Sequence, residues 1–464
     1  MRSFLGKFIG DRHFYRRVLL VTLPIILQNV ITNLVSLLDN IMVGQIGTEQ
    51  MTGVAIVNQL LFVFNLCIFG GVAGPGIFSA QFFGQGDTEG VKYSFRAKII
   101  IAIGVVAVFV AVLIPWHDQL ISLFLHKGEE NMDLAATLAF GRQYLWIMLI
   151  GLPAFALSNC YASSLRECGE TVLPMKAGVA AVFVNCILNY VLIFGKLGAP
   201  VLGVQGAAIA TVVSRYVEIV ILMVWTHGHK DKNQFIVGAF KSLYVPGALA
   251  KDIAIKGAPL LINEGLWSAA MAMLNQSYSI RGSEVVSAIN ISSTVSNLFF
   301  CAFFAFGNAV SIMVGQLLGA GELERAKDED RKLITCSVLT STFFGIVLFL
   351  TAGIIPDVYN TTPMVKEIAT QFLIVNAIFM PVNGFIHTVY FTLRCGGKTI
   401  ITFIFDSAFI WCLSVPLAFV LSRFTGIYVI YIFLAVYSLD FIKTGLGIYF
   451  LKKGSWINNL VAEN

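Results

Sequence analysis

The chain has 464 residues and a formal net charge of +5, and 57% of its residues are hydrophobic whereas only 12% are charged. Soluble globular domains carry about 25% charged residues, so this composition, with a mean hydropathy of +0.81, excludes an ordinary soluble protein and indicates an integral membrane protein. The eight cysteines show no Cys-x-x-Cys spacing, which predicts neither a disulfide framework nor a metal site.

Twelve apolar stretches are long enough to cross a bilayer as helices, which takes about 20 residues each. They are apolar all round and lack the alternation of apolar and polar residues that β-barrel strands show, so a barrel is excluded. The sequence therefore predicts an all-α membrane protein. The expected spans cover residues 18–43, 53–80, 97–117, 139–163, 172–194, 203–226, 254–280, 288–315, 332–355, 366–391, 400–421 and 427–450.

Basic residues indicate which side of the membrane each connection faces, because Lys and Arg concentrate in cytosolic loops. Placing the basic N-terminal segment in the cytosol assigns most of the 31 Lys and Arg residues to that side. Both termini are therefore expected in the cytosol, in a multi-pass protein of the plasma (inner) membrane. The opposite side then holds only a few basic residues: Lys127, Arg142, Lys196, Arg281, Lys366 and Arg423.

The second half of the chain repeats the first at an offset of 235 residues. Pro24 then aligns with Pro259, and QFFGQGDTEGVK at 81–92 aligns with QLLGAGELERAK at 316–327. The matches cluster at turns and kinks, where Gly and Pro meet particular backbone demands. An even number of spans in each half makes the repeats parallel, related by an axis along the membrane normal.

The repeat predicts two pseudo-symmetric six-helix bundles in tandem. The predicted boundaries are an N-terminal bundle at 1–226, a polar cytosolic linker at 227–252 and a C-terminal bundle at 253–464.

Each predicted bundle contains one copy of a short polar hairpin, LRECGET at 165–171 and LRCGGKT at 393–399. The main interpretation is structural: Gly169 and Gly397 supply the backbone angles of a tight turn. Thr171 and Thr399 are expected to cap the helices that follow.

Ionisable residues inside the predicted spans are candidate functional residues, because a charge at bilayer depth is costly. Asp39, Glu264 and Asp406 are isolated carboxylates in apolar surroundings. Other charges are spaced i, i+3 and can satisfy one another on a helix face. The expected structural pairs are Arg215 with Glu218 and Asp440 with Lys443.

Several motifs together carry a family resemblance over essentially the whole chain. They are the first-span sequence LPIILQNVITNLVSLLDNIMVGQIG, the Gln-x-x-Gly-x-Gly turns that begin at Gln81 and Gln316, and the two hairpins. In this order and spacing they resemble the multidrug and toxic compound extrusion (MATE) family, of a superfamily that includes lipid-linked oligosaccharide flippases. The resemblance implies efflux of organic cations or other amphipathic compounds, driven by inward Na⁺ or H⁺.

In the N-terminal half, the resemblance implies that Asp39 is a cation or proton site. Asn185 and Asn189 share a helix face in the fifth span, and Thr211 lies in the sixth. Carboxylate, amide and hydroxyl oxygens suit a hard cation. The tyrosine that some relatives place one turn before the aspartate is replaced here by Val35.

In the C-terminal half the chain departs from the pattern of many relatives. Where they place a carboxylate in spans seven and ten, this sequence has Trp267 and Asn383. It offers Glu264 and Asp406 instead, and NEGLW at 263–267 resembles another bacterial branch. We expect these carboxylates, with Asn263, Trp267 and Asn383, to form a substrate or cation site, with Trp267 available for cation–π contact.

The expected function is a cation-coupled antiporter that works by rocking one bundle against the other. Pro24 and Pro259 are plausible hinges, because proline frees an upstream carbonyl and permits bending. A flippase for a pyrophosphate lipid stays an alternative, but would need several cationic residues in its cavity, and a channel would not need this repeat. No P-loop is present, so ATP is not the expected energy source.

The expected partners are small amphipathic or cationic substrates and membrane lipids, with no nucleic acid. The protein is expected to be a monomer and not an enzyme, with no cofactor other than the coupling ion.

Overall fold

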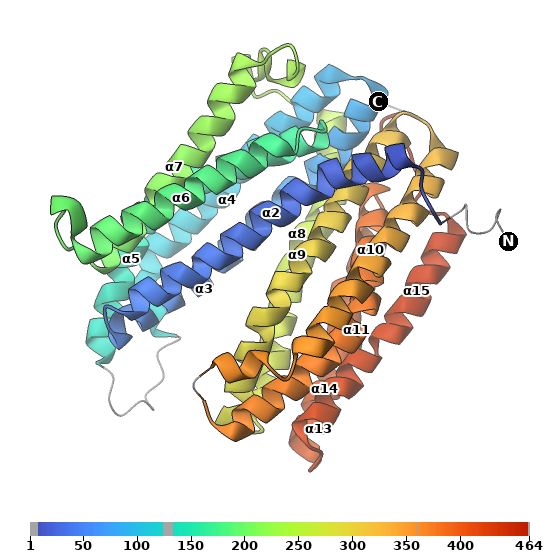
Figure 1. The fold of residues 1–464 in the computed structure, drawn as a ribbon. Coiled ribbons are helices and arrows are strands. Elements are labelled where there is room, and N and C mark those ends of the chain that lie inside the picture. The colour runs from blue at the N-terminus through green and yellow to red at the C-terminus, as the bar shows by residue number, and fades with distance from the viewer. Residues whose placement is uncertain (1–7, 124–132, 360, 463–464) are drawn as a thin grey trace. The chain divides into compact units, whose positions relative to one another are not determined.

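The computed structural model describes residues 8–123, 133–359 and 361–462, and within them every regular element is helical. Ten long helices open the chain, and two interrupted spans end it (Figure 1). The long helices are α2 (Arg12–Gly44), α3 (Thr48–Gln85), α4 (Thr88–Ser122), α5 (Leu134–Glu167), α6 (Val172–Phe194), α7 (Val204–Gly228), α8 (Gly247–Ser279), α9 (Ser283–Gly319), α10 (Leu323–Thr351) and α11 (Pro363–Cys395).

The last two spans are built from shorter pieces. The first, Thr399–Phe424, joins α12 (Thr399–Phe403) and α13 (Val415–Phe424) through two π-helical segments, η5 (Ile404–Ala408) and η6 (Ile410–Ser414). The second, Val429–Lys453, consists of α14 (Val429–Ser438) and α15 (Asp440–Lys453). Short 3₁₀ turns complete the elements: η1 (Lys196–Gly198), η2 (Gln234–Ile236), η3 (Ala239–Lys241) and η4 (Ile355–Val358).

Eleven helices of the described chain are long and apolar enough to cross a membrane. The one other predicted span, the seventh at 254–280, lies in α8, which is 33 residues long. Pro259, Asn263 and Glu264 lie near the middle of this helix and lower its hydropathy. The prediction of an all-α membrane protein made of helical bundles is confirmed. The predicted outer-side Lys127 lies outside the described residues.

The helices gather into two compact units. Unit 1 comprises Met1–Ile26, Ala80–Asp87 and Ala254–Asn464, and unit 2 comprises Leu27–Ser79 and Thr88–Ile253. The chain thus passes from one unit to the other inside α2, three residues after Pro24, and again inside α3. The predicted boundaries follow the sequence repeat, whereas the two units are defined by contacts between residues. The predicted boundaries therefore stay a prediction.

In unit 1, α9, α10 and α11 pack side by side, and α15 lies along α11 (Figure 1). The start of α2 contributes to the same apolar core, because every third or fourth residue there is buried against α9, α10 and α11. The buried residues of this segment are Phe14, Val18, Val21 and Ile25.

In unit 2, α7 packs against both α5 and α6, and α4 packs against α5. The predicted linker is partly folded onto α4 through η2 and η3. The Arg96 guanidinium of α4 donates hydrogen bonds to the carbonyls of Gly238, Ala239 and Tyr244. These contacts satisfy linker carbonyls that its irregular backbone would otherwise leave unpaired.

The ends of α3 and α9 cross inside unit 1 at repeat-equivalent residues. A Cβ atom added to Gly84 would lie 1.9 Å from the Gln316 carbonyl oxygen, and one added to Gly319 would lie 1.9 Å from that of Gln81. Reciprocal contacts between equivalent positions are those expected at a two-fold axis. The motif Gln-x-x-Gly therefore repeats because the two helices touch there through their backbones.

Both hairpins form the expected tight turn, with φ of 88° at Gly169 and 73° at Gly397. The expected threonine caps are wrong. Thr171 makes no side-chain cap bond, and Glu170 Oε1 accepts the backbone N–H of Leu173 instead. At the second hairpin Lys398, and not Thr399, occupies the cap position.

Candidate functional site

Unit 2 holds a polar cluster around the partly buried Asp39 of α2, in which Asn185 and Asn189 are buried. The Asn189 Nδ2 atom of α6 donates to Asp39 Oδ1 over 2.5 Å. One helical turn away, the hydrogen-bond pattern orients the Asn185 amide with its nitrogen 3.0 Å from both Asp39 oxygens and its oxygen 3.3 Å from the Thr211 hydroxyl. The structure thus brings together the four residues of the predicted N-terminal site, which we call the Asp39 cluster.

The Asp39 cluster has one oxygen that no hydrogen bond satisfies. Asn189 is 1% exposed, and its Oδ1 atom has no hydrogen-bond partner in the described chain. A buried, unpaired amide oxygen is costly, and its position beside a carboxylate fits this oxygen for binding a cation or a hydrogen-bond donor. Carboxylate, amide and hydroxyl oxygens are ligands for a hard monovalent cation or partners for a proton.

Tyr144 of α5 also belongs to this site, although the sequence did not indicate it. Its buried hydroxyl donates to Asn58 Oδ1 over 3.3 Å and lies beside Thr211, within electrostatic range of Asp39. Val35 of α2 offers no hydroxyl to this site, and Tyr144 supplies one from α5, the helix of the fourth span.

Unit 1 holds a second polar cluster, in which Glu264 of α8 and Asp406 of η5 are joined through two neutral residues. The Tyr390 hydroxyl of α11 donates to Glu264 Oε1 over 3.1 Å. Asn263 Nδ2 lies 3.1 Å from Asp406 Oδ2 and 3.3 Å from the Tyr390 oxygen. We call these four residues, together with Lys443 of α15, the Glu264 cluster.

Lys443 corrects one predicted pair. Its ammonium lies 2.8 Å from Asp406 Oδ1, so the expected pairing with Asp440 is wrong. Burial explains the difference: Lys443 and Gly447 are the buried residues of α15, so the lysine points into unit 1 toward η5. The other expected pair is confirmed, with Arg215 lying 3.0 Å from Glu218.

The π-helical backbone of the eleventh span carries Asp406. π-helical turns occur mostly as short interruptions at functional positions. This one is fixed to α8 because Ser407 Oγ donates to the Asn263 carbonyl over 2.8 Å, and Trp411 Nε1 donates to the Leu266 carbonyl over 2.9 Å. These bonds hold Asp406 and Asn263 in register.

The remaining predicted site residues take other places. Trp267 packs against the apolar cluster that surrounds Ala270 and Leu274, and Asn383 takes no part in the hydrogen bonds of the Glu264 cluster. Pro24 and Pro259 lie inside the continuous helices α2 and α8, as the hinge interpretation requires.

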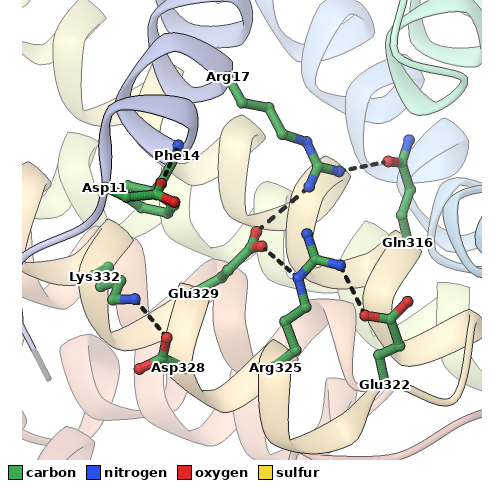
Figure 2. Close-up of polar contacts among 9 residues, drawn as sticks. All are labelled: Asp11, Phe14, Arg17, Gln316, Glu322, Arg325, Asp328, Glu329 and Lys332. Atoms are coloured by element: carbon green, nitrogen blue, oxygen red, sulfur yellow. Dashed lines mark hydrogen bonds and ion pairs between the residues drawn. The ribbon is translucent and has the colours of Figure 1, made fainter.

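An ionic cluster, which the sequence did not indicate, fastens the start of α2 to α9 and α10 (Figure 2). Arg17 lies 3.6 Å from Glu329 and donates to the Gln316 side chain over 3.3 Å. Glu329 is shared with Arg325, which also pairs with Glu322 at 2.9 Å. The segment before Pro24 is thereby held by both charge and apolar packing.

The helices pack as membrane spans, and each unit holds a carboxylate among polar partners. These features place the protein in the class of multi-pass transport proteins. The chain belongs to the MatE family, whose model matches residues 24–191 and 260–420. The resemblance found in the sequence is therefore confirmed.

Relatives match over most of the chain. The probable multidrug resistance protein NorM of Thermotoga maritima is 26% identical over 442 residues, which are 95% of this chain and 93% of the relative. The multidrug resistance protein NorM of Vibrio vulnificus is 26% identical, with 86% of each chain covered.

Solved structures share the fold. An outward-facing multidrug resistance MATE family transporter of the MOP superfamily superposes with a TM-score of 0.84 at 18% identity, covering 97% of this chain and 98% of that one. A MOP superfamily transporter from Pyrococcus furiosus, described as having a binding pocket of reversed polarity, gives 0.85 with the same identity and coverage.

Proposed function

We propose that the protein exports organic cations and other amphipathic compounds in exchange for Na⁺ or H⁺. Membership of the MatE family supports the transport class, and relatives named as multidrug resistance proteins support the substrate class. The excess of Lys and Arg in one set of connections supports a plasma membrane orientation with both termini in the cytosol.

The observation that carries the proposed coupling is the Asp39 cluster, with its carboxylate, its two asparagines and the unpaired Asn189 oxygen. An entering Na⁺ would use Asp39, Asn189 and Thr211 oxygens as ligands, whereas an entering proton would neutralise Asp39. Either occupant removes the attraction that Asp39 exerts on a cationic substrate. One charge crossing 100 mV releases about 2.3 kcal/mol, close to fifty-fold accumulation.

The change of unit within α2, just after Pro24, supports alternating access as the transport cycle. Arg17 and Phe14 keep the start of α2 with unit 1, whereas the residues from Leu27 onward belong to unit 2. Pro24 lies just before this change, at a point where a helix bends readily. Pro259 of α8 is the repeat-equivalent hinge.

The flippase alternative finds less support. Recognition of a pyrophosphate group would need unpaired cationic side chains, but Lys443 in the Glu264 cluster is already paired with Asp406. No observation on the described residues favours this alternative over export of cations.

The proposal is tested by following a fluorescent organic cation in proteoliposomes, with Na⁺ and pH gradients imposed separately. We expect one gradient to drive transport and Asp39→Asn to abolish it while the protein still folds. Asp118→Asn is the matched control, because Asp118 is 39% exposed and pairs with Arg142 away from the cluster. Transport at the wild-type rate by Asp39→Asn, or transport driven by neither gradient, would contradict the proposal.

A further inference from the structure

The Glu264 cluster already contains a cation. Lys443 Nζ lies 2.8 Å from Asp406 Oδ1, and the two side chains are only 6% and 16% exposed. The second oxygen of Asp406 accepts a hydrogen bond from Asn263 over 3.1 Å. Both oxygens of Asp406 are therefore engaged within the protein.

The ammonium of Lys443 is confined to this position. Two aromatic rings of the eleventh span lie within cation–π distance, with Phe405 at 5.3 Å and Phe409 at 5.9 Å from the nitrogen. A buried ammonium without its partner would be strongly unfavourable. A substrate that displaced it from Asp406 would have to leave it in these apolar surroundings.

Glu264 is in a different situation. It is partly exposed and accepts one hydrogen bond from Tyr390, and in the described chain no cationic side chain lies within ion-pair distance of it. The buried guanidinium of Arg394 also acts on Glu264 electrostatically. Of the two carboxylates in the cluster, Glu264 is thus the one that can meet a charge from a substrate.

We propose that Lys443 is a specificity-determining residue: as a tethered counter-ion it occupies Asp406 and restricts the Glu264 cluster to substrates with a single positive charge. A tethered group competes at a high effective concentration against any free cation. The selectivity then comes from repulsion between the Lys443 ammonium and a second substrate charge, and from the space that the ammonium fills beside Asp406. Attraction between Glu264 and the first substrate charge is the other contribution. This inference rests on the proposed function, because it names the charge class of the substrates.

A purely structural role for the ion pair predicts something different. Loss of Lys443 would then lower stability and slow the transport of all cations alike. A specificity role changes the ratio between substrates of different charge, and a general loss of activity leaves this ratio unmoved.

The test compares ethidium with propidium, which share an aromatic core but carry one and two positive charges. Transport of each is measured in proteoliposomes for the wild type and for Lys443→Met, Lys443→Gln and Lys443→Arg. All variants are compared at the same pH, because His387 lies in electrostatic range of Asp406 and Lys443.

We expect the wild type to prefer ethidium. Lys443→Met should raise the propidium-to-ethidium ratio of kcat/KM about tenfold, the effect of one extra charge contact of modest strength. Lys443→Gln, which retains a hydrogen-bond donor beside Asp406, should shift the ratio in the same direction. Lys443→Arg should keep the wild-type ratio, and the double variant Asp406→Asn/Lys443→Met should return to it.

An unchanged ratio in folded Lys443→Met and Lys443→Gln would overturn the inference, and so would a raised ratio that persists in the double variant. Fluorescence titration of the purified protein with each dye gives the corresponding ratio of propidium and ethidium affinities from their Kd values. If the wild type transports neither dye, the proposed function fails, while the binding ratio still decides whether Lys443 selects by charge.

Discussion

The crossing of α3 and α9 allows a sharp test, because it depends on two glycines. In Gly84→Ala the new Cβ atom would lie 1.9 Å from the Gln316 carbonyl oxygen, and such contacts are not seen below 3.0 Å. The helix ends would therefore have to separate by about 1 Å, because the obstructing atom belongs to a backbone and not to a flexible side chain.

Overpacking of this kind typically costs about 1 to 3 kcal/mol in the free energy of unfolding. In a chain of this size we expect the apparent Tm in detergent to fall by about 1 to 3 °C. Gly319→Ala should have the same effect from the other helix. The double variant should cost less than the sum, because the first separation makes room for the second methyl group.

Gly104→Ala is the matched control. Gly104 lies inside α4, and a Cβ atom added there would meet nothing within 4 Å. Replacing a helical glycine by alanine then stabilises by up to about 1 kcal/mol. If Gly84→Ala behaved like Gly104→Ala, or if the double variant were fully additive, the backbone contact between the repeats would not exist.

Three further substitutions test how the N-terminal and C-terminal segments are held. Gln81→Leu should free the C-terminal segment for proteolysis, because the Gln81 side chain accepts the backbone N–H of Leu460 over 2.7 Å and donates to nearby carbonyls; equal digestion rates would contradict this. Arg17→Ala should lower the free energy of unfolding by less than about 1 kcal/mol, because the Arg17–Glu329 pair is partly exposed. Phe14→Ala should lower it by about 3 to 5 kcal/mol, because Phe14 is a buried core residue. Chemical denaturation measures both values, and a larger loss for Arg17→Ala would show that apolar packing is not the main contact of this segment.

Much of the fold could be predicted because its signals are periodic. Apolar runs of span length define the helices, and the alignment of Gln81 with Gln316 identifies equivalent turns in the two halves, whereas their contact is known only from the structure. The cap at Thr171 is mispredicted because the neighbouring Glu170 carboxylate takes an N–H group of the first helical turn. The cap at Thr399 is mispredicted because the helix already begins at this residue, which places Lys398 at the cap position.

The candidate site was predictable only in part. Asn185 and Asn189 could be placed together because an i, i+4 spacing fixes a shared helix face. Tyr144 could not be added, since nothing in its own segment relates it to Asp39. Lys443 was assigned to the wrong carboxylate because sequence spacing favours Asp440, whereas the direction in which α15 buries its side chains favours Asp406.

The two units have diverged in how they neutralise a buried carboxylate. Around Asp39 the hydrogen-bond partners are neutral amides, and in the proposed function the charge is met by the coupling ion. Around Asp406 the partner is a lysine of the same chain, so no ion from solution is needed. A site that waits for an external cation suits coupling, and a site with a fixed internal cation suits discrimination among substrates. On this reasoning, placing a lysine beside Asp39 and removing the lysine beside Asp406 would move the dependence on the driving ion from Asp39 to the Glu264 cluster.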